Sequence, residues 1–488
     1  MICRLQIDRC AKIVATIGPA TRSLETIKKL LEFGVNVARL NMSHGNHQSH
    51  AEVIGYLRAA SEDMKQPLAI LLDLSGPKIR TGKLKGGKAV ELLAGSKIAI
   101  TTQELEGDEN RVSTTYTSIT KDVRIGDRIL LDDGLLELSV EEISETEVTC
   151  RVVHGGLLGE RKGINLPGVA LSTPSITEKD KRDLEFGIEN NVDYVALSFV
   201  RKAKDCIEAK ELIAKIAKEK GTSKPPLIAK IEKAEALKEL DDIIQVVDGI
   251  MVARGDLGIE TATENVPVYQ KEIIRKANIA GKIVITATQM LQSMIDNPRP
   301  TRAEASDVAN AILDGTDAVM LSGETASGAF PIEAVRTMDR IIRFTEEAVY
   351  KERFQSFSRY SLFGQHTGSY NRALAEAAVF AAEEVGSPII LVFTEGGKMA
   401  RRVAALRPRQ TIIALTHVMD TYRKLSAVWG VKSYLLRTPI VSDQMMNLID
   451  QAVTQLEVAQ PSETIVMIAG ELSGVPLSNI VKLHRVGK

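Results

Sequence analysis

The sequence has few cysteines, almost no net charge and no long apolar run. Its four cysteines, Cys3, Cys10, Cys150 and Cys206, form no C-x-x-C pair and no metal-binding spacing, which favours idle thiols in a reducing compartment. The net charge of −1 provides no global field that would attract nucleic acid or a membrane surface. No apolar stretch reaches the length of a membrane span, and the first residues hold no apolar signal segment. These absences predict a cytoplasmic protein without nucleic-acid or membrane partners.

The length of 488 residues exceeds what one core can organise, so two or three domains are expected. Eight short apolar runs, typical of strands buried on both faces, lie at 12–18, 35–43, 68–74, 192–200, 227–232, 249–255, 282–289 and 317–324. They alternate with helical patterns at 24–32, 49–64, 178–190, 203–220, 234–246, 266–280, 302–313 and 331–347. Eight strand-then-helix units in sequence predict an α/β fold, a (β/α)8 TIM barrel.

One connection interrupts these units. Residues 79–172 show no helical period and indicate short strands joined by glycine-rich turns such as Gly86-Gly87 and Gly155-Gly156. We therefore expect a β domain inserted into a barrel that comprises residues 1–78 and 173–345. Because loops after barrel strands lie at the face where barrel active sites sit, such an insert can close over a site as a lid.

From residue 346 to residue 488 the pattern restarts as a separate α/β domain with an open sheet. Its predicted helices are 371–385, 398–406, 422–429 and 443–458, and its predicted strands are 388–394, 411–415, 431–436, 464–468 and 480–484.

Acidic residues end two neighbouring predicted strands of the barrel, Glu232 in one and Asp256 in the next. Adjacent parallel strands lie about 4.8 Å apart, so two carboxylates at their ends can share one hard cation such as Mg²⁺. Lys230 precedes Glu232 by two residues and therefore points to the same face. A divalent metal beside a lysine suits a phosphate or an enolate. Strand-end charges that only face water are the alternative.

Other strand ends add positive charge, because Arg39, Arg80 and Lys202 accompany Lys230. In a barrel these ends converge on one face, which predicts a pocket for phosphate and metal. Phosphoryl transfer depends on positioned positive charge rather than on a covalent nucleophile. No Ser-His-Asp or Cys-His arrangement stands out in the sequence, so hydrolase chemistry is not favoured.

Over nearly its whole length the chain resembles pyruvate kinase. The resemblance implies a TIM barrel, an inserted β-barrel lid domain and a C-terminal α/β regulatory domain with an open sheet. The matching segments are long and specific to the family: Lys12-Ile13-Val14-Ala15-Thr16-Ile17-Gly18-Pro19-Ala20, Asn165-Leu166-Pro167-Gly168, and residues 38–45, 76–82, 229–232, 251–258, 287–291, 300–313 and 320–325.

The resemblance implies transfer of the phosphoryl group of phosphoenolpyruvate to ADP, giving pyruvate and ATP. Glu232 and Asp256 would be the ligands of Mg²⁺, with Mn²⁺ as an alternative metal. Lys230 would stabilise the migrating phosphoryl group and the enolate, and Arg39 would clamp the phosphate. Thr288 would lie near the route of the proton that converts enolpyruvate to pyruvate.

The same resemblance assigns groups around the substrate carboxylate. Gly255, Asp256 and Thr288 would hold it, partly through backbone N–H groups at a helix start. Since a threonine hydroxyl alone is a poor acid, Ser322 and Glu324 would relay the proton through water. Support of the site by packing is the alternative role for these two residues.

On the nucleotide side, the resemblance implies contacts from Asn41, His44, Arg80 and Lys202. His44 could instead cap its own loop. The substrates and products would therefore be phosphoenolpyruvate, ADP, ATP and pyruvate.

The monovalent-cation site of the family would use Asn41, Ser43, Asp73 and the carbonyl oxygen of Leu74. Many members carry a glutamate where Lys78 stands, and a fixed ammonium can replace a bound K⁺ electrostatically. We therefore predict that activity does not require K⁺. A solvated lysine at the hinge of the lid is the alternative.

The C-terminal domain departs from the family at residues 394–402, where a predicted strand leads into a helix. Gly397 and Met399 lack the hydroxyl groups that a sugar bisphosphate would use, and Glu395 adds a repelling charge. Control by fructose 1,6-bisphosphate is therefore not expected. AMP, a sugar monophosphate or a plain turn without an effector are the alternatives. The family also implies a homotetramer.

Two other functions compete with a kinase. A barrel lyase or aldolase acting on pyruvate or phosphoenolpyruvate would keep the Glu232–Asp256 pair but would need neither a lid nor the cations Arg39, Arg80 and Lys202. A catalytically inactive relative acting as an effector sensor would predict loss of Lys230 or a metal ligand, and none is lost.

Overall fold

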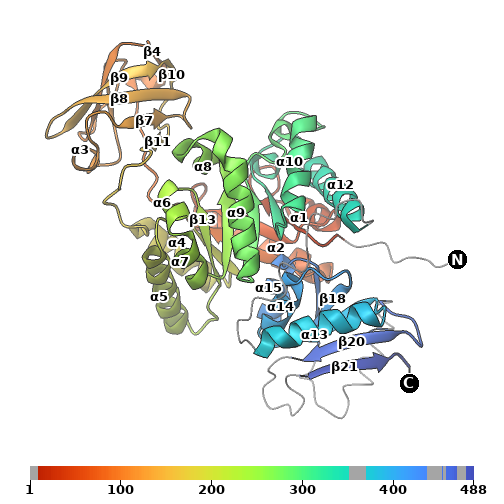
Figure 1. Cartoon of the computed structure of the whole chain (residues 1–488). Coiled ribbons are helices and arrows are strands. Elements are labelled where there is room, and N and C mark those ends of the chain that lie inside the picture. Colours follow the sequence, from red (N-terminus) through yellow and green to blue (C-terminus); the bar gives the residue numbers. More distant parts are fainter. Residues whose placement is uncertain (1–8, 351–369, 437–452, 454–457, 470–479, 488) are drawn as a thin grey trace.

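The computed structural model describes residues 9–350, 370–436, 453, 458–469 and 480–487. In Figure 1 the inserted β domain lies at one end of the molecule, the barrel in the middle and the C-terminal domain at the other end. None of the helices in these ranges is long and apolar enough to cross a membrane.

Burial raises the pKa of the Cys150 and Cys206 thiols to about 12, so both thiols stay protonated and unreactive near neutral pH.

Eight parallel strands close into a barrel in the order β1-β16-β15-β14-β13-β12-β3-β2, which confirms the predicted TIM barrel. Registers such as Thr16 with Arg39 and Asn41 with Asp73 bring the carboxyl ends of neighbouring strands level. The strands are β1 Lys12–Thr16, β2 Val37–Asn41, β3 Ala69–Asp73, β12 Tyr194–Leu197, β13 Leu227–Ile231, β14 Gly249–Ala253, β15 Ile283–Ala287 and β16 Ala318–Leu321.

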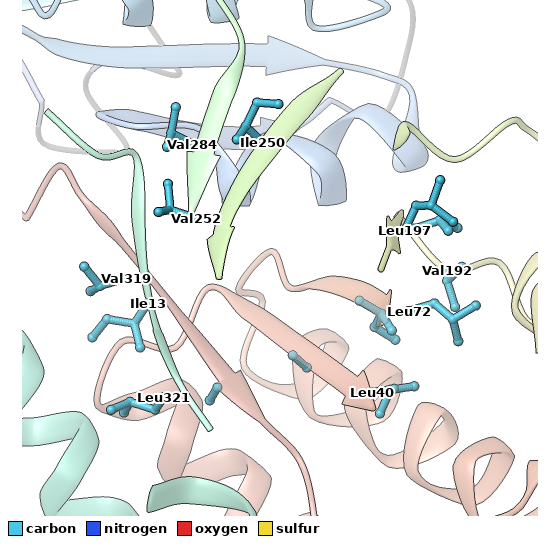
Figure 2. Packing of buried hydrophobic residues seen from close by; sticks show 14 of the residues in the cluster. Ile13, Leu40, Leu72, Val192, Leu197, Ile250, Val252, Val284, Val319 and Leu321 are labelled. Atoms are coloured by element: carbon cyan, nitrogen blue, oxygen red, sulfur yellow. The ribbon is translucent and has the colours of Figure 1, made fainter. Parts of the chain in front are cut away.

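Apolar residues on both faces explain why these segments form barrel strands. All residues of β1, β3, β14 and β15 are buried. Ile13, Leu40 and Leu72 belong to a cluster shared with the surrounding helices (Figure 2). Val14 and Leu71, each next in sequence to one of these, point to the opposite side and belong to a second cluster, which joins the barrel interior to residues of the C-terminal domain.

Helices follow the barrel strands as predicted, with a few differences, one of which is the unpredicted short helix α11 after β16. The helix predicted at 234–246 is divided at Glu239, whose φ of −99° and ψ of 13° are not helical. The strand predicted at 249–255 ends at Ala253, because Arg254 already begins a helix whose first turn holds the acidic Asp256. The helices of this part are α1 Leu24–Glu32, α2 His47–Asp63, α4 Glu178–Glu189, α5 Ala203–Lys220, α6 Ala234–Lys238, α7 Leu240–Val246, α8 Arg254–Glu260, α9 Val266–Ile279, α10 Arg302–Leu313, α11 Gly323–Ala326 and α12 Pro331–Tyr350.

Several of the helix starts carry a complete capping box. Thr177 caps α4 and Thr301 caps α10, each in a capping box with the third residue of its helix.

Helix α12 runs across the predicted domain boundary between residues 345 and 346. The exact limits of the three domains stay predictions.

The insert is built from β strands, as predicted. Six form a sheet in the order β11-β7-β8-β9-β5-β6, and β10 and β4 form a two-stranded sheet. Arg80 bridges Gly163 beside β11, and Thr81 bridges Thr114 beside β6. The first residues of the insert therefore join the two edges of the large sheet and curve it toward a barrel. The elements are β4 Val90–Leu92, β5 Lys97–Thr101, β6 Arg111–Ser113, β7 Arg128–Leu131, β8 Leu136–Ile143, β9 Glu147–His154, β10 Gly156–Leu158, β11 Ile164–Asn165 and the unpredicted short helix α3 Ile119–Asp122.

The C-terminal domain has an open sheet in the order β19-β18-β17-β20-β21, with only the β20–β21 pair antiparallel among the described strands. The helix predicted at 422–429 is instead α15 followed by a 3₁₀ turn, which ends because Val428 is extended. Most of the helix predicted at 443–458 lies outside the described residues. The elements are α13 Tyr370–Glu384, α14 Lys398–Ala405, α15 Met419–Lys424, β17 Ile389–Phe393, β18 Thr411–Thr416, β19 Val431–Leu435, β20 Thr464–Ala469 and β21 Ile480–Arg485.

The C-terminal domain covers the amino-terminal end of the barrel. Lys12 at the start of β1 donates to the Val431 carbonyl over 2.8 Å, and Tyr194 at the start of β12 donates to the Lys424 carbonyl over 2.7 Å. The carboxyl ends of the barrel strands lie at the opposite end, beside the inserted domain (Figure 1).

Candidate active site

Four charged side chains meet at the carboxyl ends of β2, β3 and β13. Arg39 Nε donates to Asp73 Oδ2 over 2.7 Å. Lys230 Nζ lies 2.7 Å from Glu232 Oε1 and 3.4 Å from Asp73 Oδ1. Because residues two apart on a strand share a face, the spacing of Lys230 and Glu232 predicted that both point to the same side of the strand. All four residues are buried or nearly so.

The pKa values in this cluster reflect mutual neutralisation. Burial would raise the pKa of Asp73, but Lys230 and Arg39 outweigh it and hold that pKa below its ordinary value. Burial would lower the pKa of Lys230, but Asp73 and Glu232 more than offset it and raise that pKa. The cluster therefore keeps a fixed positive charge on Lys230 across the physiological range.

Glu232 and Asp256 are the acidic residues that could hold a divalent cation. Burial raises the pKa of Glu232; Lys230 opposes the rise, and the Asp256 carboxylate adds to it. A shared cation would relieve this repulsion, so the pair fits the expected metal. In the described part of the chain no three His, Cys, Asp or Glu side chains gather to hold a metal ion. A Mg²⁺ held by two carboxylates takes its other ligands from phosphate or water.

Thr288 and Gly255 adjoin each other where β15 and β14 end. The backbone N–H of Gly255 donates to Thr288 Oγ1 over 2.9 Å. Thr288 has a φ of 69°, which a β-branched residue adopts only when its surroundings impose it. Arg254 holds this backbone in place: its guanidinium donates to the carbonyl oxygen of Thr288 over 2.6 Å and pairs with Asp307 over 2.7 Å.

Sequence reasoning gave no role to Arg254, Ser198 or Thr16. Ser198 Oγ accepts from Lys230 Nζ over 2.8 Å and donates to the Leu74 carbonyl over 2.7 Å. Thr16 Oγ1 accepts from Arg39 Nη1 over 2.9 Å. Each of the three residues lies at the carboxyl end of a barrel strand, and that position is the signal that could have found them.

The loop after β2 brings several predicted residues to the edge of this cluster. Asn41 Oδ1 accepts from the N–H of Ser43 over 3.1 Å. Burial lowers the pKa of His44, and the positive charges of Lys78, Arg80 and Arg39 lower it further. His44 therefore lies within the electrostatic field of three cations that the sequence assigned to the same site.

Helix α4 fixes the loops that follow β2 and β3. Lys179 Nζ donates to the Met42 carbonyl over 2.6 Å. Gly76 donates its N–H to Asp180 Oδ1 over 3.0 Å and has a φ of 65°. A Cβ at Gly76 would lie 2.6 Å from the Phe199 ring, so only glycine fits there.

Three predicted residues lie apart from the buried cluster. Lys78 and Lys202 are exposed. Arg80 Nη1 donates to the Arg161 carbonyl within the inserted domain over 3.0 Å. Because the backbone of Arg80 also pairs with Gly163 at one edge of that domain's sheet, the place of Arg80 relative to the barrel depends on the position of the insert.

Glu324 is fully buried and uses both carboxylate oxygens as acceptors. Its Oε2 accepts from the N–H of Ser322 over 2.8 Å, and its Oε1 accepts from the N–H of Leu291 over 3.1 Å. These bonds join the end of β16 to the loop that carries Thr288 and Gln289, which favours a supporting role over a direct part in proton transfer.

In the C-terminal domain, residues 394–397 form a tight turn before α14, whose first residues make up the rest of the segment 394–402. Gly397 has a φ of 74° and donates its N–H to Thr394 Oγ1 over 2.9 Å. Thr421 Oγ1 donates to the Glu395 carbonyl. Both hydroxyl groups near this helix start are therefore engaged with the protein itself.

The fold and the site define a (β/α)8-barrel protein with an inserted β domain, a C-terminal α/β domain and a buried cluster of acids and cations at the carboxyl ends of its strands. Residues 8–335 match the family described as pyruvate kinase, barrel domain, and residues 372–484 match the pyruvate kinase alpha/beta domain. The chain belongs to the pyruvate kinase family.

Known proteins resemble the chain along nearly all of it. A pyruvate kinase of Geobacillus stearothermophilus is 44% identical over 483 residues, which cover 98% of this chain and 80% of the relative. One of Bacillus licheniformis is 43% identical over 481 residues, covering 98% and 81%. The crystal structure of a pyruvate kinase from Cryptosporidium parvum has a TM-score of 0.91 to this chain at 38% identity, covering 98% of this chain and 96% of that one.

Proposed function

We propose that the chain transfers the phosphoryl group of phosphoenolpyruvate to ADP, giving pyruvate and ATP. The observation that carries the proposal is the cluster of Arg39, Asp73, Lys230 and Glu232 at the carboxyl end of the barrel, in a chain of this family. Two fixed cations and an acidic pair suit a phosphorylated acid better than a neutral substrate.

Arg39 and Lys230 supply the positive charge. Asp73 contacts both, so it orients the two cations relative to each other. Lys230 keeps its proton and stabilises negative charge on the migrating phosphoryl group and on the enolate oxygen that it leaves. Glu232 and Asp256 would hold Mg²⁺ or Mn²⁺, which would supply positive charge to offset the negative charge of the phosphate.

Gly255, Asp256 and Thr288 bind the substrate carboxylate. The left-handed backbone of Thr288 and the Gly255–Thr288 hydrogen bond hold these two residues side by side at the ends of β15 and β14. Proton delivery to the enolate passes near Thr288 Oγ1 through water. Ser322 and Glu324 support this segment by holding the loop after β15.

On the nucleotide side, Asn41, His44, Arg80 and Lys202 contact ADP, and closure of the inserted domain brings Arg80 to the site.

The activity does not require K⁺, because Asp73, the acidic residue of the monovalent-cation site, is already neutralised. Asp73 contacts Arg39 through Oδ2 and Lys230 through Oδ1, and Leu74 accepts the Ser198 hydroxyl through its carbonyl oxygen. The exposed Lys78 would supply the fixed positive charge that replaces a bound K⁺.

We also propose that the enzyme is a cytoplasmic homotetramer. Any effector of the C-terminal domain would be a monophosphate such as AMP or a sugar monophosphate that contacts the turn and helix start at residues 394–402. The engaged hydroxyl groups of Thr394 and Thr421 support the exclusion of a sugar bisphosphate from this turn.

The test is an assay of pyruvate formation from phosphoenolpyruvate with ADP and Mg²⁺, coupled to lactate dehydrogenase and NADH. Omission of ADP separates a kinase from a lyase or phosphatase. Pyruvate that forms only with ADP, with equal formation of ATP, is the expected result. Pyruvate formation without ADP, or no turnover by a folded protein, would refute the proposal.

A further inference from the structure

Glu260, the last residue of α8, connects the inserted β domain to the barrel. Asn165 of β11 donates through Nδ2 to Glu260 Oε1 over 3.2 Å. Lys233 Nζ lies 2.6 Å from the same oxygen. The Glu260 and Lys233 side chains are only 1% and 6% exposed, so this is a buried ion pair at the junction of two domains. In Figure 1 α8 lies directly beside β11.

One set of contacts runs from this junction to Glu232. Lys233 follows Glu232 in the chain, and its Nζ lies 5.8 Å from the centroid of the Phe199 ring. The backbone N–H of Phe199 donates to Glu232 Oε2 over 2.7 Å. Lys233 therefore touches the residue that fixes the orientation of the Glu232 carboxylate.

A second connection runs through α8 itself. Asp256 lies one helical turn before Glu260, so the position of the helix end fixes the position of Asp256. Glu260 is thus linked to both acidic residues of the site, to Glu232 by side-chain contacts and to Asp256 by the helix backbone.

Stability alone does not account for this arrangement. Glu260 Oε2 is buried and accepts no hydrogen bond from the described residues. A buried carboxylate oxygen without a partner is destabilising, and apolar residues in place of a buried ion pair are often as stable or more so. The pair is better explained by positioning.

We propose that Glu260 is a positioning residue that ties the contact of the inserted domain, made by Asn165, to the placement of Glu232 and Asp256. Docking of the insert on Glu260 holds Lys233 and α8 in the geometry in which the two carboxylates share a cation. This proposal rests on the proposed function, which identifies Glu232 and Asp256 as the residues that hold the metal. It also gives a role to Asn165 of the Asn-Leu-Pro-Gly segment, a residue that has no other proposed role.

Binding of free Mn²⁺ tests the proposal without turnover. Electron paramagnetic resonance gives the Mn²⁺ dissociation constant of the unmodified enzyme and of Asn165→Ala and Glu260→Ala, without substrates. Groups that orient metal ligands affect affinity by about tenfold or more, so both variants should bind Mn²⁺ at least about tenfold more weakly. Glu264→Ala, which changes an exposed glutamate four residues further on, is the matched control and should bind as the unmodified enzyme does.

The double variant Asn165→Ala/Glu260→Ala decides whether the two residues act through their contact. If they do, adding Asn165→Ala to Glu260→Ala has no further effect on the Mn²⁺ dissociation constant. Hydrogen exchange should rise at residues 254–260 in Asn165→Ala, although the substitution lies in the other domain. Asn165 is only partly buried, so this variant keeps its fold even where Glu260→Ala does not.

Steady-state kinetics completes the test. Because misplaced metal ligands affect the transition state more than the ground state, Asn165→Ala should lower kcat about tenfold with a smaller change in KM for phosphoenolpyruvate. Unchanged Mn²⁺ affinity and unchanged exchange at 254–260 in Asn165→Ala would overturn the proposal. An unmodified enzyme that binds Mn²⁺ but forms no pyruvate from phosphoenolpyruvate and ADP would refute the proposed function instead.

Discussion

Lys230 reaches Asp73 across an intervening strand. The two residues lie on β13 and β3, which are both neighbours of β12 in the barrel, and Lys230 Nζ is 3.4 Å from Asp73 Oδ1. Ser198, which follows β12, fills the space between them by accepting from Lys230 and donating to the Leu74 carbonyl. Asp73 is therefore the common anion that holds Lys230 and Arg39 together.

Replacing Asp73 by Asn should weaken both stability and activity. At neutral pH the change leaves two buried cations without their shared anion, which costs about 3 kcal/mol. The pKa of Asp73 is lower in the folded protein than in the unfolded chain, so its ionised form stabilises the fold above about pH 4 and that contribution disappears as the pH falls further. The measurement is urea unfolding of both proteins from neutral to acidic pH. A stability difference that stays constant below about pH 4 would contradict this account.

Lys230→Met should reduce kcat by at least about a hundredfold, with a much smaller effect on KM for phosphoenolpyruvate. The lysine acts on charge that develops in the transition state, so its loss affects the chemical step more than binding. Initial-rate kinetics at saturating Mg²⁺ measures the changes in kcat and KM separately. Lys215→Met, an exposed lysine on α5, is the control. A raised KM with unchanged kcat would mean that Lys230 only anchors the substrate.

Glu232→Gln and Asp256→Asn should each nearly abolish turnover while the fold stays intact. Either change would remove one charged ligand from the cation that offsets the charge of the transferring phosphate. Circular dichroism checks the fold, and a Mg²⁺ titration of activity checks whether excess metal compensates. Near-normal rates of both variants at an ordinary Mg²⁺ concentration would show that Glu232 and Asp256 do not hold the metal.

Activity should be nearly independent of K⁺, because the chain supplies the positive charge that a bound K⁺ would add. The assay uses buffer without sodium or potassium, with Mg²⁺ and an organic counterion, before and after KCl is added. Lys78→Glu should make the enzyme respond to K⁺, since the carboxylate attracts a cation. Large activation of the unmodified enzyme by K⁺, beyond the effect of a matched organic salt, would disprove the idea that Lys78 replaces a bound K⁺.

Light scattering at working concentration should give a particle with four times the 53.2 kDa mass of one chain. Closed symmetric assemblies are the common way in which such chains couple a regulatory domain to a distant site. A particle with the mass of a single chain would contradict the proposed homotetramer.

The barrel could be predicted from sequence because its signal is local and repeated. Strands such as 68–74 are apolar on both faces, and helix starts such as Thr177 carry their caps within a few residues. The spacing of Lys230 and Glu232 places both on one face without any tertiary information. Boundaries were less certain: the division of α6 from α7 at Glu239 has no strong local signal.

Contacts between distant segments were decided only by the tertiary structure. Arg39 with Asp73, Lys230 with Ser198, and Asn165 with Glu260 join residues on different strands or domains, and no periodicity relates them. The closed barrel brings eight strand ends to one rim, and the curvature of the insert places β11 above α8. The sequence by itself determined which residue types stand at the strand ends. Barrel closure and domain docking determined which of them touch, because these depend on the packing of the whole chain.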